Sequence, residues 1–130
     1  MGKQLLAKGM GASPGTATGE IVFRAEDAVA LAAQGKSVIL VRIETTVEDV
    51  PGMRAAAGIV TTRGGITGDA AIVARSLGKP CIASCAPLRV DYGTNSLTVW
   101  RDSGDDADDA VLKKGDVITI DGGKGEIWAG

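Results

Sequence analysis

The sequence predicts an α/β fold with small mixed sheets and two or three helices. Short apolar segments rich in Val and Ile alternate with segments of helix-forming residues along the 130-residue chain. Hydrophobic residues make up 45% of the chain, which is enough to build one buried core. Nineteen glycines occur without a regular period, which indicates turns and close backbone approaches. We therefore expect residues 1–130 to form a single domain.

The expected strands are short apolar segments bounded by glycine, proline or charged residues. They lie at residues 5–7, 20–23, 37–41, 57–61, 81–83, 96–100, 117–120 and 126–128. The segment at 37–41 is apolar almost throughout, which is typical of a central strand. The last three strands are expected to form a β-meander with glycine turns. Pro14-Gly15 fits a tight turn because Pro presets φ and Gly tolerates positive φ.

Two segments have the composition and spacing of helices. Residues 25–33 are helix formers with apolar positions at helical spacing, and residues 69–77 form a similar segment that glycine and proline then stop. A further helix is expected to begin at Thr45, because Thr45 and Glu48 have the spacing of a capping box. Pro51 would fall within its first turns, where proline is tolerated.

Charge and composition argue against several classes of function. The net charge is −2 and no basic stripe with interleaved aromatic residues occurs, so we expect no nucleic-acid partner. No apolar segment approaches the length of a membrane span, and the N-terminus lacks the layout of a signal peptide. We expect a soluble, cytoplasmic protein. The acidic residues 101–109 lack the spacing of a calcium loop and are interpreted as a solvated loop.

Cys81 and Cys85 are the only cysteines, and the chain contains no histidine. A disulfide between them is conceivable, but two cysteines four residues apart near a helix exit are more typical of reduced core thiols. A zinc site would need further ligands. We expect neither a metal nor a cofactor. The absence of histidine also removes the usual phosphate carrier and the usual general base near neutral pH.

The segment from Thr61 to Cys85 is the candidate functional site. A strand ends there, Gly64 and Gly65 follow, and a helix begins within four residues. Glycines let backbone N–H groups converge, and the first turn of a helix presents unpaired N–H groups at the positive end of its dipole. Arg63 would add a fixed cation, so the segment predicts an anion site. A Gly-Gly turn before a helix is also typical of a simple strand-to-helix connection.

The longer sequence resembles the pattern TRGGxTSHAAxVAR, followed by GKPC, of the phosphohistidine domain of phosphoenolpyruvate-utilising enzymes. This group includes pyruvate phosphate dikinase, phosphoenolpyruvate synthase and the first enzyme of the sugar phosphotransferase system. The matching residues are Thr62, Arg63, Gly64, Gly65, Thr67, Ala70, Ala71, Val73, Ala74, Arg75, Gly78, Lys79, Pro80 and Cys81. Residues 11–15, with Gly19, resemble the opening turn of the family. Residues 39–45 and 48–49 resemble its dikinase branch, and residues 116–122 with 125–126 resemble its closing hairpin.

The resemblance implies a swivelling β/β/α domain. In the family, the histidine takes a phosphoryl group at an ATP-grasp domain and the domain then swings to a TIM-barrel domain, where phosphate passes to or from pyruvate. The expected partners are therefore these two domains of a dikinase-like enzyme. Arg63, Gly64, Gly65 and Thr67 would bind phosphate. Family Ser-His is replaced here by Gly68-Asp69, so Asp69 stands at the position of the phosphate acceptor.

Asp69 has two interpretations. As a helix-start residue it would accept backbone hydrogen bonds, contribute about 0.5–2 kcal/mol by capping, and place a negative charge in the phosphate pocket. The domain would then fold without carrying phosphate on histidine. Alternatively, Asp69 is itself phosphorylated, as aspartates are in some ATPases. Thr67 either caps the helix or lines the pocket, or it corresponds to the threonine that a regulatory kinase modifies in plant dikinases.

Three functional hypotheses follow from this resemblance. The chain is a carrier-domain relative of a dikinase-type transferase, present as a separate polypeptide or as an excised fragment. It cannot catalyse the whole reaction alone, since it contains neither partner domain. Alternatively, it is a non-catalytic regulatory module that binds an anion or a partner through Arg63, Gly64 and Gly65. In the third hypothesis, the change to Asp69 is an engineered or variant form of an active carrier.

Overall fold

The computed structural model describes residues 5–45, 47–63, 69–85, 88–99 and 110–129. Its strands form two sheets. The larger, eight-stranded sheet has the spatial order β1 (Leu5–Lys8), β11 (Glu126–Ala129), β10 (Val117–Asp121), β3 (Thr16–Val22), β4 (Val38–Arg42), β5 (Gly58–Thr61), β6 (Cys81–Ala83) and β2 (Met10–Ser13). The smaller, antiparallel sheet contains β7 (Leu88–Asp91), β8 (Ser96–Val99) and β9 (Ala110–Lys113).

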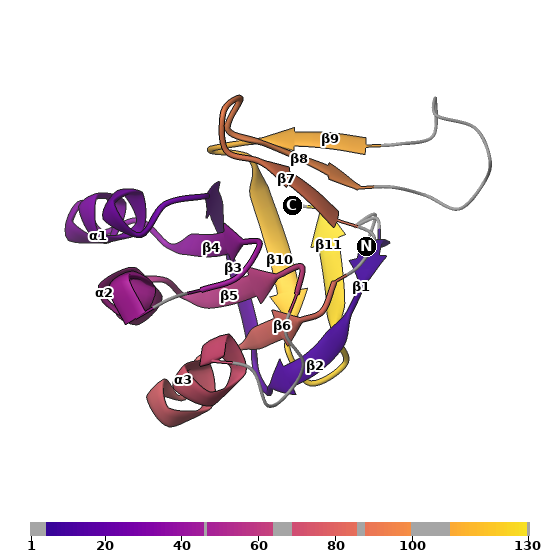
Figure 1. Cartoon of the computed structure of the whole chain (residues 1–130), viewed down its shortest axis with the longest axis horizontal. Helices are drawn as coiled ribbons and strands as arrows, with labels where there is room; N and C mark the ends of the chain where they lie inside the picture. The colour runs from indigo at the N-terminus through magenta and orange to yellow at the C-terminus, as the bar shows by residue number, and fades with distance from the viewer. Residues whose placement is uncertain (1–4, 46, 64–68, 86–87, 100–109, 130) are drawn as a thin grey trace.

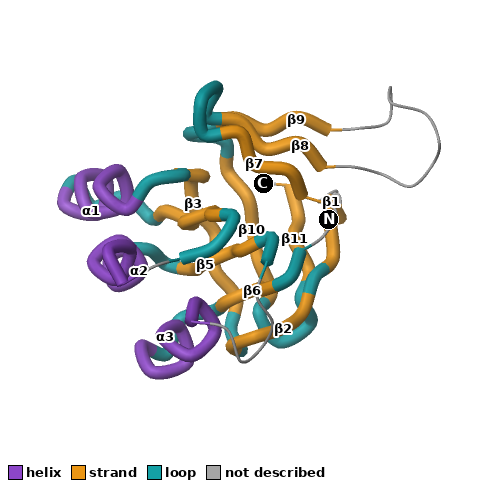
Figure 2. The backbone as a smooth tube through the Cα atoms, in the orientation of Figure 1, coloured by secondary structure: helices purple, strands orange, loops and turns teal. Residues whose placement is uncertain are grey.

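The centre of the large sheet is parallel and carries the helices. Strands β3, β4, β5 and β6 pair in parallel in that order. They are joined in turn by α1 (Ala25–Ala33), by α2 (Val50–Ala55) with a preceding 3-10 turn η1 (Val47–Asp49), and by α3 (Asp69–Leu77). Parallel neighbours need such crossovers. The three helices lie together on one side of the sheet, away from the small sheet (Figure 1, Figure 2).

Two hydrophobic clusters pack on opposite faces of the central strands. Neighbouring residues on a strand point to opposite faces, so Val22, Leu40 and Ile59 pack with helical residues, while Ile39 and Val60 pack on the other side. The second face also receives Leu88, Leu97 and Val99 from the small sheet. The layers are therefore small sheet, large sheet and helices, which confirms the predicted α/β fold class with small mixed sheets.

The two edges of the large sheet belong to one continuous segment. β1 pairs with β11, β2 pairs with β6, and Gly9 alone separates β1 from β2. The Gly9 N–H donates to Gly125 O at 2.8 Å, so the segment stays bonded where it changes partner. Gly122, in the turn between β10 and β11, packs so tightly that a Cβ there would collide with the Ser13 carbonyl oxygen. The sheet thereby almost closes on itself.

Most predicted elements are confirmed. The structure gives α1 and α3 the predicted bounds, 25–33 and 69–77, and Gly78 follows α3 with a φ of 68°. The strand predicted at 37–41 is β4, which lies inside the sheet and is buried over Val38–Val41. The thiols of Cys81 and Cys85 are free and buried, as expected. The acidic residues 101–109 lie outside the described residues.

The predicted start of the second helix at Thr45 is wrong. The 3-10 turn begins at Val47 and α2 begins at Val50, with Asp49 at the N-cap position but without a side-chain cap hydrogen bond. The physical reason is Pro51, which has no N–H to donate to the carbonyl of residue 47. Regular α-helical hydrogen bonding therefore starts only around Pro51. Thr45 is a buried residue that precedes the 3-10 turn and does not cap the helix.

The predicted β-meander at the end of the chain is also wrong. β8 lies in the small sheet between β7 and β9, whereas β10 and β11 belong to the large sheet. β10 pairs with β3 on one side and β11 on the other. Strands β2, β7 and β9 were not expected. Among the described residues, no helix is both long and apolar enough to cross a membrane.

Candidate anion site at the end of strand β5

The candidate site begins where β5 ends. Beyond the paired strands, the Thr62 N–H donates to Arg42 O at 3.2 Å and the Arg63 N–H donates to Ile43 O at 3.1 Å. The buried Thr61 hydroxyl donates to Arg63 O at 2.9 Å. Backbone bonds and one buried hydroxyl therefore fix the peptide groups on both sides of Arg63. Its side chain is exposed to solvent, in agreement with a cation that can receive an anion.

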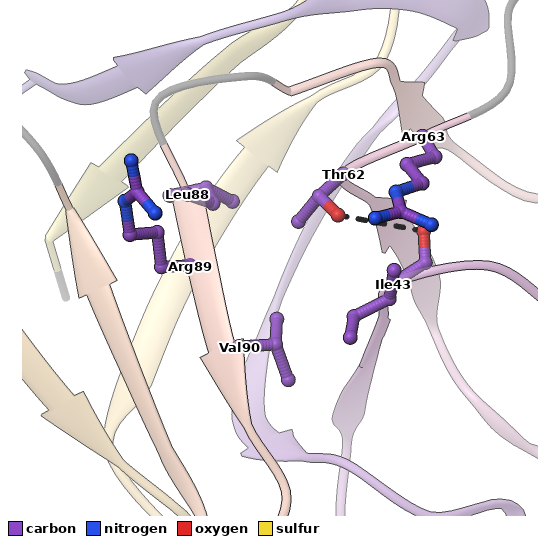
Figure 3. Close-up of a pocket in the computed structure, with 6 residues that line it drawn as sticks. All are labelled: Ile43, Thr62, Arg63, Leu88, Arg89 and Val90. Atoms are coloured by element: carbon purple, nitrogen blue, oxygen red, sulfur yellow. Dashed lines mark hydrogen bonds between the residues drawn. The ribbon is translucent and has the colours of Figure 1, made fainter.

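A pocket of about 370 Å³ opens beside Arg63. Its lining residues come from the ends of β4 and β5 and from β7: Ile43, Thr62, Arg63, Leu88, Arg89 and Val90. Leu88 and Val90 face Thr62 and Ile43 across the pocket, whereas the guanidinium of Arg89 extends to the other side of β7 (Figure 3). The Thr62 hydroxyl donates to Ile43 O at 3.5 Å. The pocket thus has an apolar wall and a rim that carries Arg63.

Helix α3 begins at Asp69, the residue predicted for its first turn. The first N–H groups of a helix lack intrahelical partners and carry the positive end of the helix dipole. Arg63 and this helix start follow one another in the sequence, but among the described residues the pocket beside Arg63 is lined from the β4 and β5 ends and from β7, not from α3. Of the other predicted phosphate ligands, Gly64, Gly65 and Thr67 lie outside the described residues.

Arg75 and Lys79, which belong to the same sequence motif, have structural contacts. The Arg75 Nη1 donates to Ala12 O at 3.0 Å, so this side chain joins α3 to β2. The Lys79 Nζ donates to Ala56 O at 2.7 Å, at the C-cap of α2. The Arg75 side chain therefore points to β2. These two cations hold the helices in place.

Cys81 and Cys85 are fully buried in β6 and just after it. Burial disfavours the thiolate and raises the pKa of each thiol from 9.0 to about 12, and the Arg75 charge only partly offsets this for Cys81. Reactive or metal-binding cysteines need the thiolate. Within the described ranges, no group of three or more His, Cys, Asp or Glu residues could hold a metal. These thiols are therefore core residues.

Sequence reasoning missed two side chains next to the pocket-lining residue Ile43, namely Arg42 and Tyr92. The Tyr92 hydroxyl accepts a hydrogen bond from the Ile43 N–H at 2.7 Å. The Arg42 guanidinium carbon lies 4.5 Å from the centroid of the Tyr92 ring, and its Nη1 donates to Phe23 O at 2.7 Å. The sequence signal was weak: Tyr92 is the only tyrosine, and it precedes the Gly93 of a turn.

One known protein family matches most of the chain. The family described as "PEP-utilising enzyme, mobile domain" matches residues 34–125, a range that contains both the β5 end and α3. A solved structure titled "NMR solution structure of Enzyme I (nEIt) protein" is 24% identical and covers 70% of this chain and 29% of its own, with a TM-score of 0.45.

Curated relatives match almost the whole chain. Pyruvate, phosphate dikinase of Rhizobium meliloti (strain 1021) is 48% identical over 98% of this chain and 13% of its own length. The chloroplastic enzyme of Flaveria pringlei is 50% identical over 97% of this chain and 12% of its own. Pyruvate, phosphate dikinase 2 of Oryza sativa subsp. japonica is 50% identical over 99% of this chain and 14% of its own.

The chain therefore spans between 12% and 14% of the length of these relatives. The match to the family covers well over half of the 130 residues. It includes the strand end that carries Arg63 and the helix that Asp69 begins. The chain belongs to the PEP-utilising enzyme mobile domain family.

Proposed function

We propose that this chain is a phosphocarrier-type domain of a pyruvate phosphate dikinase-like enzyme, with Asp69 at the position of the phosphate-accepting histidine. The observation that carries the proposal is the connection from β5 through Arg63 to α3, which has Asp69 as its first residue. Identities of 48–50% to pyruvate, phosphate dikinases support the dikinase branch of the family. The expected partners are a nucleotide-binding ATP-grasp domain and a pyruvate- or PEP-binding TIM-barrel domain.

The proposed carrier has lost its acceptor and kept its scaffold. None of the 130 residues is a histidine, so no phosphohistidine can form on them. The features expected to attract phosphate do not depend on the acceptor: an exposed arginine beside a pocket and the beginning of a helix. Because Asp is well tolerated at a helix start, the substitution leaves the fold intact. The chain alone is then inactive as a phosphotransferase.

The test restores the acceptor by the substitution Asp69→His. The full chain and this variant are incubated with radiolabelled phosphoenolpyruvate and a dikinase that lacks its own carrier domain. We expect acid-labile, base-stable label on Asp69→His and none on the wild type, with Asp69→Asn as the matched control. If Asp69→His remains unlabelled although its amide spectrum shows the native fold, the proposal that only the acceptor was lost is wrong.

The alternative in which Asp69 accepts phosphate is tested by the same assay. An acyl phosphate is a mixed anhydride: hydroxylamine attacks its carbonyl carbon, forms a hydroxamate and releases inorganic phosphate. Label on the wild type that hydroxylamine removes and that Asp69→Asn abolishes would establish this second function. The shorter carboxylate places its oxygen short of where an imidazole nitrogen would lie, which is why we favour the first.

A second candidate function, a binding module for an anion or a partner, is favoured by the pocket beside Arg63. This candidate needs no phosphoryl transfer and would use the exposed guanidinium directly. Its test is an inorganic phosphate titration of the chain followed through the backbone amide of Arg63. Chemical-shift changes that saturate, and that disappear in Arg63→Gln but persist in Arg54→Gln on α2, support an anion module. Unchanged shifts in the wild type exclude phosphate as its ligand.

A cytoplasmic location is also part of the proposal. The free, buried thiols of Cys81 and Cys85 are compatible with a reducing compartment, where disulfides are rare. Fractionation of cells that express the tagged full-length protein tests this, and recovery in a secreted or membrane fraction would refute it. Regulatory phosphorylation of Thr67 remains a proposal of its own, testable by mass spectrometry of the protein purified from its source.

A further inference from the structure

A single peptide group links the candidate site to the small sheet. The peptide between Arg42 and Ile43 accepts a hydrogen bond from the Thr62 N–H through its carbonyl oxygen, at 3.2 Å. Through its N–H, the same peptide donates to the Tyr92 hydroxyl, at 2.7 Å. Hydrogen bonds that share a peptide group polarise one another and strengthen cooperatively. Tyr92 therefore acts on Thr62, and on Arg63 next to it, through one intervening peptide.

The neighbouring peptide repeats the connection to the β5 end. Ile43 O accepts from the Arg63 N–H at 3.1 Å and from the Thr62 hydroxyl at 3.5 Å. Both polar ends of Ile43 are thus bonded, one to the small sheet and one to the site. β4 ends at Arg42 and β5 ends at Thr61, so these contacts extend the pairing beyond the two strands. The position of residue 43 therefore determines where Arg63 leaves the sheet.

Tyr92 is itself held in place from several directions. Its ring packs against the main hydrophobic cluster and lies 4.5 Å from the Arg42 guanidinium carbon. At this distance a cation–π contact is favourable. Arg42 is fixed in turn by its bond to Phe23 O and by an ion pair with the buried Asp49 carboxylate, Nε to Oδ2 at 3.6 Å. The hydroxyl of Tyr92 thus has a defined position from which to accept the Ile43 N–H.

The turn that carries Tyr92 is also well ordered by local bonds. Asp91 Oδ1 accepts the N–H groups of Gly93 at 2.9 Å and Thr94 at 3.3 Å. Carboxylate-to-backbone bonds of this kind stabilise tight turns. The small sheet, which contributes no predicted phosphate ligand, therefore presents one hydroxyl group to the strand extension that bears the site.

We propose that Tyr92 is a positioning residue for the anion site: its hydroxyl fixes the Arg42–Ile43 peptide and thereby the backbone of Thr62 and Arg63. The identity of the bound anion rests on the proposed function. The positioning of the Thr62 and Arg63 backbone does not depend on it. Without the hydroxyl, the Ile43 N–H loses its acceptor, and the β5 end becomes free to sample other positions.

The substitution Tyr92→Phe removes the hydroxyl and keeps the aromatic ring. Amide hydrogen exchange in the ¹⁵N-labelled full chain is measured at Thr62 and Arg63, relative to Val60 within β5. Loss of one hydrogen bond predicts exchange about three- to tenfold faster at Thr62 and Arg63, with Val60 changed much less. Exchange at Thr62 and Arg63 within twofold of the wild type would overturn the proposal.

Two matched proteins separate positioning from general destabilisation. Leu112→Ala truncates a half-buried side chain of the small sheet outside this hydrogen-bond chain. If Leu112→Ala accelerates Thr62 exchange as strongly as Tyr92→Phe, the hydroxyl has no specific role. Because Tyr92 is the only tyrosine, biosynthetic 3-fluorotyrosine labels it alone and retains the hydroxyl. Because fluorine next to the hydroxyl weakens it as a hydrogen-bond acceptor, exchange at Thr62 and Arg63 is expected to be faster than in the wild type but slower than in Tyr92→Phe; exchange faster than in Tyr92→Phe would contradict the proposal.

The effect on binding is measured with inorganic phosphate in the Asp69→Asn background, where the acidic charge is removed. Tyr92→Phe is expected to raise the dissociation constant about three- to tenfold, while Leu112→Ala leaves it within twofold. If Asp69→Asn binds no phosphate at all, the anion function fails, and the exchange result still decides the role of Tyr92. If Asp69→Asn binds phosphate with the same affinity with and without Tyr92→Phe, Tyr92 does not position the site.

Discussion

Raising the pH should destabilise this domain through its two buried thiols. Cys81 and Cys85 are each 0% exposed, and burial raises the pKa of both from 9.0 to about 12. Below pH 9 the thiols are protonated in the folded and unfolded states alike, so they do not make stability depend on pH. Between pH 9 and pH 12 the unfolded chain releases both protons while the folded chain retains them. Stability is therefore lost as the pH rises through this interval.

The size of the loss follows from the number of protons. Two thiols that stay protonated only in the folded state lower the free energy of unfolding by about 3 kcal/mol per pH unit above pH 9. At pH 10.5 the loss is about 4 kcal/mol, a large part of the 5–15 kcal/mol that is typical of a native domain. The thiols thus set an alkaline limit to the stability of the fold.

The assay is urea unfolding between pH 7.5 and pH 10.5, for the wild type and for the double variant Cys81→Ala/Cys85→Ala. All other titratable groups are the same in the two proteins, so their contributions cancel in the difference. The alanine cavities lower stability by an amount that does not depend on pH. We expect the wild type to lose stability more steeply by about 3 kcal/mol per pH unit above pH 9. Parallel curves for the two proteins would refute the reasoning.

Two further predictions concern packing. Gly122→Ala places a methyl group against the Ser13 carbonyl and should lower the unfolding free energy by at least about 2 kcal/mol. The control is Gly123→Ala, whose added Cβ meets only a side-chain oxygen at 3.4 Å, and it should change the unfolding free energy by less than about 1 kcal/mol. Equal urea midpoints for the two variants would contradict the closure described for the sheet. Lys79→Met removes the 2.7 Å hydrogen bond to Ala56 O and should lower the free energy of unfolding, measured in the same way, by about 1–2 kcal/mol. A loss below the experimental error would show that this hydrogen bond does not hold α2 in place.

The parts of the fold that the sequence predicted are those with local causes. Helices 25–33 and 69–77 have continuous helix formers and a glycine after each, so their bounds could be predicted within a residue. The apolar segment of β4 has no room for solvent on either face. By contrast, β2, β7 and β9 are four-residue strands whose pairing partners are distant or equally short. Such strands form because of tertiary pairing, which local sequence does not encode.

The same division applies to the candidate site. Arg63 could be predicted at a strand end because the β-branched residues of β5, Ile59–Thr61, precede it. Tyr92 could not, because its partner is the backbone N–H of Ile43, 49 residues away. No periodicity or spacing connects a turn of one sheet to the strand end of another. Because the partner is a backbone N–H, which nearly every residue type has, the identity of residue 43 gives no indication of the contact.

The pairing of β1 with β11 has a mechanical consequence. Leu5 lies opposite Trp128, so the described chain enters and leaves the domain on two neighbouring strands. Strands β1 and β11 lie beside each other in Figure 1. In a longer polypeptide, both tethers would leave from one place on the surface. A body held at a single place can turn as a unit about that point, because rotation there stretches neither tether and disturbs no internal contact.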